Sequence, residues 1–160
     1  MLQAKVVAVG KVKEKFLQEG IREYSKRLSS YLRLDIVEVT DEPCPEKLSE
    51  AEEDRVREKE GERILKALNS QDYVVLLDLK GKELTSPELA NFIDDLALYG
   101  RSNIAWVIGG SLGVADSVRE RSDFCWSFSK LTFPHLLMRV MLLEQIYRAM
   151  KISKGEPYHK

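Results

Sequence analysis

Four short apolar runs, rich in β-branched residues, limit most strongly what this chain can fold into. Residues 5–9 (KVVAV), 73–79 (YVVLLDL) and 103–108 (NIAWVI) are nearly continuous, and residues 34–39 (LDIVEV) form the fourth run. Continuous apolar runs of this length are typical of parallel strands that are buried on both faces of a sheet. A weaker fifth run, FCWS, occupies residues 124–127. We therefore expect strands at these five positions.

Helical patterns separate the runs, with apolar residues spaced three and four positions apart. Ser86 and Pro87 are typical of a helix start, with Ser86 as the cap and Pro87 at the first helical position. The alternation of strands and helices predicts an α/β fold with a mainly parallel sheet flanked by helices, formed by residues 1–160 as a single domain. The expected helices cover residues 14–31, 49–68, 86–99, 115–121 and 134–152.

Composition excludes several classes of protein. Of the 160 residues, 44% are hydrophobic and the formal net charge is −1, which excludes a disordered chain. Cys44 and Cys125 are far apart and lack metal-binding spacing, so we expect free thiols in a reducing compartment. The apolar run Val6–Val9 is too short for a signal peptide or a membrane span. These features predict a cytoplasmic protein that does not enter a membrane.

Charge is distributed unevenly along the chain. Residues 1–33 carry eight basic and three acidic side chains, residues 41–62 carry four and ten, and residues 119–160 carry eight and four. The two basic ends can converge into one basic face of the kind that binds nucleic acid, whereas the alternative interpretation is a set of solvated helix faces. The side chains expected in such a face are Lys11, Lys13, Lys15, Arg22, Arg27, Lys154 and Lys160.

Glycines follow several of the expected strands, at the strand ends where open α/β sheets bind ligands. Gly10 follows the first run, residues 78–82 (DLKGK) end the third, and residues 109–113 (GGSLG) follow the fourth. The GGSLG stretch matches neither the dinucleotide fingerprint nor the phosphate-binding loop. It is either a loop that lets a ligand approach the main chain closely or a purely structural turn.

The sequence indicates neither a metal centre nor a hydrolase triad. His135 and His159 are the only histidines, and an HExxH motif is absent. The GxSxG motif of a nucleophile elbow is also absent. We therefore expect no metal cofactor.

The C-terminal third combines a polar aromatic loop with an unusually apolar helix. Residues 127–133 (SFSKLTF) lead into a Pro-started helix, a setting that offers unpaired backbone N–H groups to a ligand. His135 and Arg139 share one arc of that helix and either satisfy buried carbonyls or belong to a site or subunit interface. Because the helix is apolar on most of its circumference, it must be covered on more than one side, which predicts a homodimer. The expected interface positions include Leu136, Val140 and Leu143.

Taken together, five segments resemble the bacterial large-subunit ribosomal RNA pseudouridine N3-methyltransferases, which belong to the SPOUT class. They are VVAVGKVKEKF (6–16), EKEGERIL (58–65), VIGGSLGV (107–114), the stretch from SFSKLTF to QIYRA (127–149) and the terminal PYHK (157–160). The resemblance implies a SPOUT-type fold with a deep C-terminal trefoil knot, an exception to the usual unknotted chain. It also implies S-adenosylmethionine as methyl donor and a homodimer. The implied substrate is a pseudouridine of 23S ribosomal RNA in the assembled ribosome.

The same resemblance assigns candidate cofactor-binding residues. An adenine ring needs apolar walls and backbone hydrogen bonds, and the methionine part needs a few polar partners. Leu77, Leu131 and Phe133 are candidate walls, and Ser129 and Thr132 are candidate polar partners. The full set carried over is Leu77, Gly109, Phe128, Ser129, Lys130, Leu131, Thr132 and Phe133.

Catalysis is expected to depend on the C-terminal tail and on Arg139. The N3–H group is an imide, and a site assists its reaction by taking the proton or by stabilising the anion. His159 is the candidate for the proton, because histidine exchanges protons most readily near neutral pH. Arg139 and Lys160 are candidates for stabilising the anion, and Tyr158 for contacting the base. Residues 155–157 (GEP) can turn the tail back toward a site, which in a dimer can belong to the partner subunit.

Two other functions are compatible with parts of the sequence. A non-catalytic RNA-binding module explains the basic ends and the loop aromatics, and a nucleotide-binding or hydrolase-like enzyme explains the glycine loop alone. The intact FSKLTF loop favours the methyltransferase, because a pure RNA binder has no need of a cofactor loop. The missing phosphate-loop and nucleophile-elbow motifs disfavour the third function.

Overall fold

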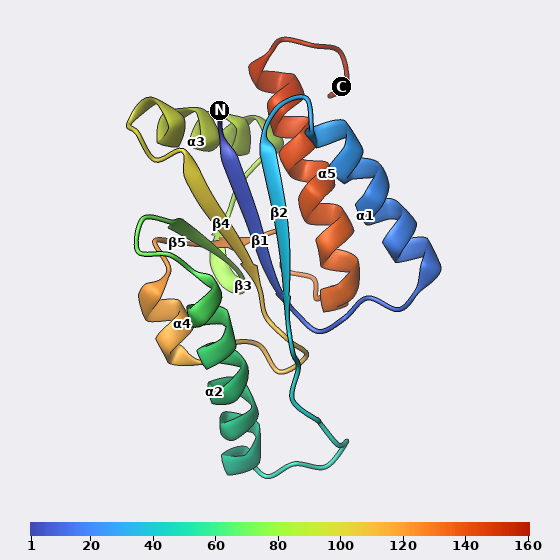
Figure 1. The fold of residues 1–160 in the computed structure, drawn as a ribbon, viewed down its shortest axis with the longest axis vertical. Helices are drawn as coiled ribbons and strands as arrows, with labels where there is room; N and C mark the ends of the chain where they lie inside the picture. The colour runs from blue at the N-terminus through green and yellow to red at the C-terminus, as the bar shows by residue number, and fades with distance from the viewer.

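The computed structural model describes all residues from 1 to 160, which form one five-stranded sheet (Figure 1). All neighbouring strands are parallel, in the order β2-β1-β4-β3-β5. The predicted α/β fold with a parallel sheet is therefore confirmed, whereas the trefoil knot stays a prediction. The strands are β1 (Gln3–Val9), β2 (Arg33–Val39), β3 (Tyr73–Glu83), β4 (Asn103–Ile108) and β5 (Phe124–Ser127).

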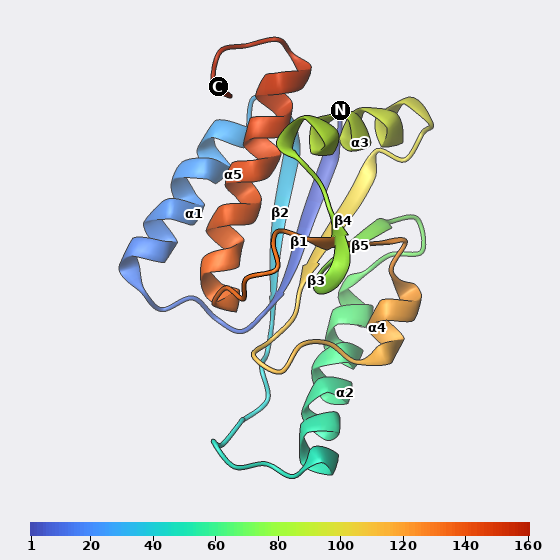
Figure 2. The same ribbon diagram turned by 180° about the vertical axis from the view of Figure 1, so that it is seen from behind.

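Five helices cover the sheet in two layers (Figures 1 and 2). One layer, of α1, α3 and α5, covers a core of 19 buried residues, and the other, of α2 and α4, covers a core of 10. No helix has both the length and the apolar character that crossing a membrane requires. The helices are α1 (Lys15–Leu28), α2 (Glu50–Ala67), α3 (Ser86–Leu98), α4 (Asp116–Arg121) and α5 (His135–Ser153).

Strand β1 shows why the sheet needs both layers. Val6 and Ala8 belong to the larger core, whereas Val7 and Val9 belong to the smaller core on the opposite face. Successive side chains of a strand point to opposite faces, so a strand covered on both sides is apolar at every position. None of these four residues is more than 1% exposed. The continuous runs in the sequence therefore reflect two-sided burial.

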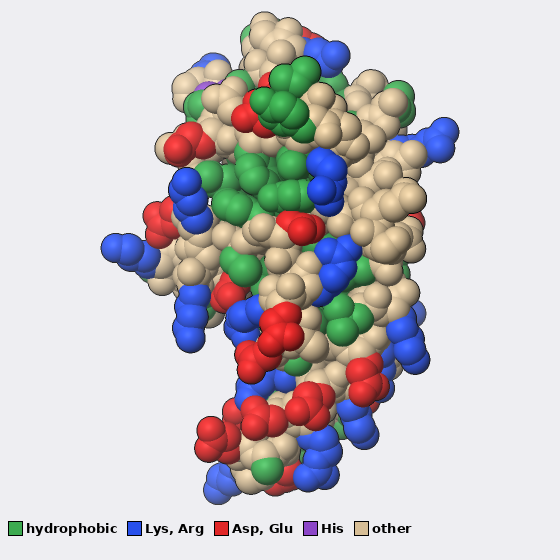
Figure 3. Space-filling view, turned by 90° about the vertical axis from the view of Figure 1, so that its left-hand side faces the viewer, with side chains coloured by type: hydrophobic (Ala, Val, Ile, Leu, Met, Phe, Trp, Pro, Cys, Tyr) green, Lys and Arg blue, Asp and Glu red, His purple; other side chains and the backbone are tan.

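Helix α2 buries Ile64 in the smaller core and carries several local interactions along its length. Arg57 lies 3.8 Å from Glu53 and 2.5 Å from Asp54, on neighbouring turns of the helix. At the helix start, the Ser49 hydroxyl accepts a hydrogen bond from Glu52 N–H, and the Glu52 carboxylate accepts one from Ser49 N–H. Side chains of both charges crowd the lower end of the face in Figure 3, where α2 lies.

The start of α3 differs from the prediction. Thr85, and not Ser86, is the cap, so that Pro87 becomes the second helical residue. The Thr85 hydroxyl accepts a hydrogen bond from Glu88 N–H at 3.2 Å, and the Glu88 carboxylate accepts one from Thr85 N–H at 2.9 Å. This reciprocal pairing requires an acidic residue three positions after the cap, and only Thr85 has one at that spacing.

Strand β3 continues beyond its predicted end at Leu79. Its register against β5 shifts between Leu77 and Lys82, which both pair with Trp126, so the residues between them leave the ladder. Gly81 is required in this irregular segment, because an added Cβ would lie 2.6 Å from the carbonyl carbon of Cys125. The irregularity makes Leu77 the last residue of the regular strand.

Replacing Leu28 by Ala should strongly destabilise the protein. Leu28 lies on α1 and is fully buried in the larger core. Removing a buried leucine side chain lowers the free energy of unfolding by about 3 kcal/mol. Leu98→Ala is the matched control, because Leu98 is 76% exposed and its loss should cost less than about 0.5 kcal/mol. Denaturant unfolding followed by circular dichroism measures both, and equal effects would contradict this assignment of the core.

Candidate active site

A cavity of about 600 Å³ lies beyond the carboxyl ends of β3, β4 and β5. Three segments provide most of its lining: residues 77–80 of β3, residues 108–114 from the last residue of β4 onward, and the stretch 126–135 from the end of β5 to the start of α5. Parallel strands end at the same edge of a sheet, which brings these distant segments together. Ligands of open α/β folds bind at this edge, so the cavity is the candidate site.

Seven of the eight predicted cofactor-binding residues line this cavity. The eighth, Lys130, lies in the same loop but is exposed and does not contribute to the lining. The sequence prediction and the geometry therefore point to one place in the fold. The seven lining residues are Leu77, Gly109, Phe128, Ser129, Leu131, Thr132 and Phe133.

Hydroxyl groups and aromatic packing hold the loop after β5 in shape. Ser127 Oγ donates a hydrogen bond to the Ser129 carbonyl oxygen at 2.9 Å, and Leu131 N–H donates one to Ser129 Oγ at 3.0 Å. The Phe128 ring packs edge-on against Trp126, with ring centroids 4.6 Å apart. Leu131 remains 67% exposed, so it offers apolar surface to a ligand in the cavity.

The glycine loop after β4 packs too closely for side chains at two positions. A Cβ added to Gly109 would lie 2.6 Å from Val114 Cγ1, and one added to Gly110 would lie 2.7 Å from Glu60 Oε1. Gly113, which has a φ of +85°, closes the loop with a hydrogen bond from its N–H to the Gly110 carbonyl oxygen. The bare main chain of Gly109 and Gly110 therefore borders the cavity.

An ion pair that the sequence analysis missed joins two walls of the cavity. Asp78 Oδ2 lies 3.0 Å from Arg119 Nε, and Arg119 Nη1 donates a hydrogen bond to the Val114 carbonyl oxygen at 3.2 Å. Asp78 and Arg119 both line the cavity. The two residues are 41 positions apart and share no motif. The one feature of the sequence that could have indicated this pair was an acidic residue at the end of a strand. The pair ties the end of β3 to the glycine loop.

Glu60 lies beneath the glycine loop and is only 4% exposed. Its Oε2 accepts a hydrogen bond from Glu42 N–H at 3.0 Å, whereas Oε1 has no partner. Burial raises the pKa of the Glu60 carboxyl above its ordinary value, partly offset by the bond from Glu42. The environment of the loop therefore favours the protonated form of this side chain.

His135, the first residue of α5, is the histidine that lines the cavity. Burial, followed by the charge of Arg139, lowers the pKa of the His135 imidazole. The neutral ring therefore predominates at neutral pH, and it can both donate and accept a hydrogen bond. The sequence left two interpretations open for His135, as a site residue or as a group that satisfies buried carbonyls, and its place at the cavity favours the first.

Arg139, a predicted catalytic residue, does not line the cavity. Its Nη2 donates hydrogen bonds to the carbonyl oxygens of Val9 and Gly10 at 2.8 and 2.7 Å, and its Nη1 lies 2.7 Å from Glu38 Oε2. The side chain is 3% exposed. This geometry favours the structural alternative, in which Arg139 satisfies buried carbonyl groups where β1 ends.

The predicted catalytic residues of the tail, Tyr158 and His159, lie far from the cavity within one chain. The Tyr158 ring packs edge-on against Tyr147, and His159 Nδ1 lies 3.1 Å from Arg148 Nη1. Arg148 lies thirteen positions after His135 at the cavity, a distance of about 20 Å along α5. Figure 2 shows that the tail turns back and places the C-terminus beside the end of α5 that lies away from the cavity. A single chain therefore does not bring the tail to its own cavity.

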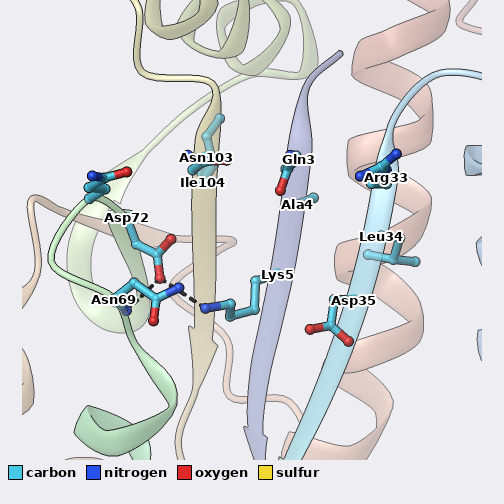
Figure 4. Close-up of a pocket in the computed structure, with 11 residues that line it drawn as sticks. Gln3, Ala4, Lys5, Arg33, Leu34, Asp35, Asn69, Asp72, Asn103 and Ile104 are labelled. Atoms are coloured by element: carbon cyan, nitrogen blue, oxygen red, sulfur yellow. Dashed lines mark hydrogen bonds and ion pairs between the residues drawn. The ribbon is translucent and has the colours of Figure 1, made fainter.

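A second cavity, of about 260 Å³, lies over the amino-terminal parts of β1, β2 and β4 (Figure 4). Its lining carries both charges, and Lys5 Nζ is bound by Asp72 Oδ2 and by the Ala67 carbonyl oxygen, both at 3.1 Å. It lies at the edge of the sheet opposite to the strand ends that bind ligands. No group of three or more His, Cys, Asp or Glu side chains is arranged to hold a metal ion.

Comparison with known proteins identifies the class to which this fold and cavity belong. The family described as "Predicted SPOUT methyltransferase" matches residues 2–159, so the chain belongs to the SPOUT methyltransferase family. The family resemblance seen in the sequence is thereby confirmed.

Several relatives match along almost their whole length, and each is named ribosomal RNA large subunit methyltransferase H. The protein of Desulfitobacterium hafniense strain Y51 is 65% identical over 160 residues, which is all of both chains. That of Carboxydothermus hydrogenoformans is 57% identical, over 99% of this chain and 100% of the relative. That of Clostridium kluyveri is 56% identical, over 97% of this chain and 98% of the relative.

Glu60→Gln should stabilise the protein relative to the wild type as the pH rises. A carboxyl with a raised pKa holds its proton more tightly in the folded state. Its contribution to stability is therefore lost as the pH rises from the ordinary pKa through the raised one. As the pH rises above the ordinary pKa of a glutamate, the difference in unfolding free energy should therefore shift toward the variant. Urea denaturation at several pH values measures this shift, and a pH-independent difference would contradict it. Exposed Glu58→Gln is the control.

Proposed function

We propose that this protein transfers a methyl group from S-adenosylmethionine to N3 of a pseudouridine in 23S ribosomal RNA. One observation carries the proposal: seven predicted cofactor-binding residues from three distant segments meet at one cavity at the strand ends. The full-length similarity to proteins named ribosomal RNA large subunit methyltransferase H supports the class of substrate. We propose further that residues 1–160 act as one domain, in the cytoplasm, on the assembled ribosome.

The residues around the cavity fit S-adenosylmethionine. When bound, this cofactor supplies a methyl group that its sulfonium charge activates. Leu77, Leu131 and Phe133 provide apolar walls for an adenine ring, and the main chain at Gly109 permits close approach. The Asp78 carboxylate at the cavity wall is paired with Arg119, which lines the same cavity, so the polar part of the wall carries both charges.

The proposed enzyme is a homodimer, because the tail must reach the cavity of a second copy. Apolar side chains of α5 remain available for an interface: Leu137 is 36% exposed, and Leu136 and Val140 are partly exposed. Leu143, which the sequence analysis placed at the interface, is instead 1% exposed in the chain's own core. The reason is that α5 turns this face toward the sheet and its neighbouring helices.

Within such a dimer, the side chains of this protein have separate tasks. The cavity residues hold the methyl donor, and Tyr158 and His159 from the partner chain contact the base. The exposed lysines Lys13 and Lys15 lie just before and at the start of α1, beside the end of β1, on the same edge of the sheet as the cavity. They are placed to neutralise phosphate groups of the RNA.

Leu131→Ala should weaken the binding of S-adenosylmethionine without destabilising the fold. Leu131 lines the cavity but is 67% exposed, so its apolar surface is buried mainly when a ligand binds. Loss of that burial should raise the Kd about tenfold. Leu98→Ala is the matched control, because Leu98 is 76% exposed and lies outside the cavity. Isothermal titration calorimetry measures both, and an unchanged Kd for Leu131→Ala would contradict the proposed cofactor site.

A chain truncated after Gly155 should still dimerise and bind S-adenosylmethionine but transfer little methyl to ribosomes. The truncation removes Tyr158 and His159 and leaves α5 and the cavity intact. Loss of groups that assist the proton or the anion lowers the rate by about a hundredfold or more. Light scattering checks the dimer, calorimetry checks the cofactor, and incorporation of labelled methyl groups checks transfer. Full activity of the truncated chain would refute the role of the tail.

A further inference from the structure

The C-terminal tail is anchored against α1 and α5, which gives His159 a defined position. Gly155, at a φ of +66°, turns the chain back after α5. The Glu156 carboxylate then accepts hydrogen bonds from the Tyr31 hydroxyl at 3.1 Å and from Lys151 Nζ at 3.2 Å. The Tyr158 ring packs against Tyr147 and lies 4.7 Å from the guanidinium carbon of Arg148. The tail is therefore a built element of the structure.

Arg148 determines which nitrogen of the His159 ring carries a proton. Arg148 Nη1 lies 3.1 Å from His159 Nδ1. A guanidinium group has only N–H donors and no acceptor, so Nδ1 must be the acceptor. The single proton of the neutral ring therefore resides on Nε2.

Glu144 in turn holds Arg148. Its Oε1 lies 2.9 Å from Arg148 Nε and 2.6 Å from Arg148 Nη2, one helical turn away. This bond raises the pKa of the Arg148 guanidinium above its ordinary value, so the donor to His159 stays charged. The other titratable groups of the cluster are Tyr158 of the tail, Tyr24 of α1 and Tyr147 of α5. His159 Nε2 has no protein partner within the chain and is free to meet a substrate.

We propose that His159 stabilises the substrate anion by donating a hydrogen bond from Nε2–H, and that Arg148 is the positioning residue that makes it a donor. This inference rests on the proposed function and assigns the role of the tail in it. In the reaction, the N3–H bond breaks and its proton goes to water. The N3 electron pair bonds to the methyl carbon, and the electrons of the carbon–sulfur bond remain on sulfur. The carbonyl oxygens that flank N3 carry the negative charge that His159 meets.

Replacing His159 by Gln and by Ala distinguishes a hydrogen-bond donor from a general base at this position. The Gln amide places an N–H close to the position of Nε2 but cannot accept the proton, whereas Ala provides neither function. If His159 acts as a hydrogen-bond donor, His159→Ala lowers kcat about a hundredfold, whereas the kcat of His159→Gln stays within about tenfold of the wild-type value. Both variants keep the wild-type Kd for S-adenosylmethionine, and His159→Gln keeps the wild-type dependence of kcat on pH. A Gln variant as inactive as the Ala variant overturns the proposal and makes His159 a base.

The position of the proton can be observed directly by NMR of the full chain labelled with ¹⁵N-histidine. The His159 signals are assigned by their loss in His159→Gln. The proposal requires a proton on Nε2 and a bare Nδ1 at neutral pH, and a proton on Nδ1 overturns it. This NMR measurement does not depend on methyl transfer. If the wild-type chain transfers no methyl to ribosomes, the proposed function fails, whereas the assigned tautomer is still tested.

Variants of Arg148 test the positioning role. The double variant Glu144→Gln with Arg148→Met removes the donor without leaving an unpaired carboxylate, and the single variant Arg148→Lys keeps a donor. We expect the double variant to lose the bond at Nδ1 and to lower kcat about tenfold at an unchanged Kd for the cofactor. Arg148→Lys should retain more activity than the double variant. If the double variant keeps the wild-type kcat, Arg148 does not position His159.

Discussion

Burial of both faces of the central strands β1 and β4 is the constraint on which the rest of this structure depends. Val6 and Trp106 lie in the larger core, whereas Val7 and Val107 lie in the smaller core on the opposite face. Apolar surface of this extent requires a layer of helices on each side of the sheet. Once both faces are covered, the main chain is accessible chiefly at the strand ends. The cavity beyond β3, β4 and β5 is therefore a consequence of how the core is built.

Polar interactions then hold the strand ends in place. Arg139 binds the carbonyl oxygens of Val9 and Gly10 at the end of β1, and the pair of Asp78 and Arg119 joins β3 to the glycine loop. Polar groups that leave water need hydrogen-bond partners in the protein. Each of these hydrogen-bonded contacts therefore holds the strand end or loop that provides the partner. The result is a cavity whose walls are positioned before any ligand binds.

Helix α5 links the two parts of the proposed mechanism. Its first residue, His135, lies at the cavity, and Arg148, near its other end, holds His159 of the tail. Because a rigid helix keeps these groups about 20 Å apart, one chain cannot apply its tail to its own cavity. Two copies can complete each other, which makes dimerisation a requirement of the chemistry that we propose. The pair of Glu144 and Arg148 then presents His159 as a donor.

The sequence by itself determined the positions of the five strands and the five helices, because these follow from local periodicity. The family resemblance predicted the cofactor-binding role of the loop after β5, and that role stays a prediction. The cap at Thr85 was missed by one position, since a reciprocal hydrogen-bond pair outweighed the preference of proline for the first helical position. Only the tertiary structure revealed that Arg139 serves the end of β1, that Leu143 is already buried, and that Asp78 meets Arg119. Each of these contacts joins residues on separate elements, and which partners meet is decided by how the layers pack on the sheet.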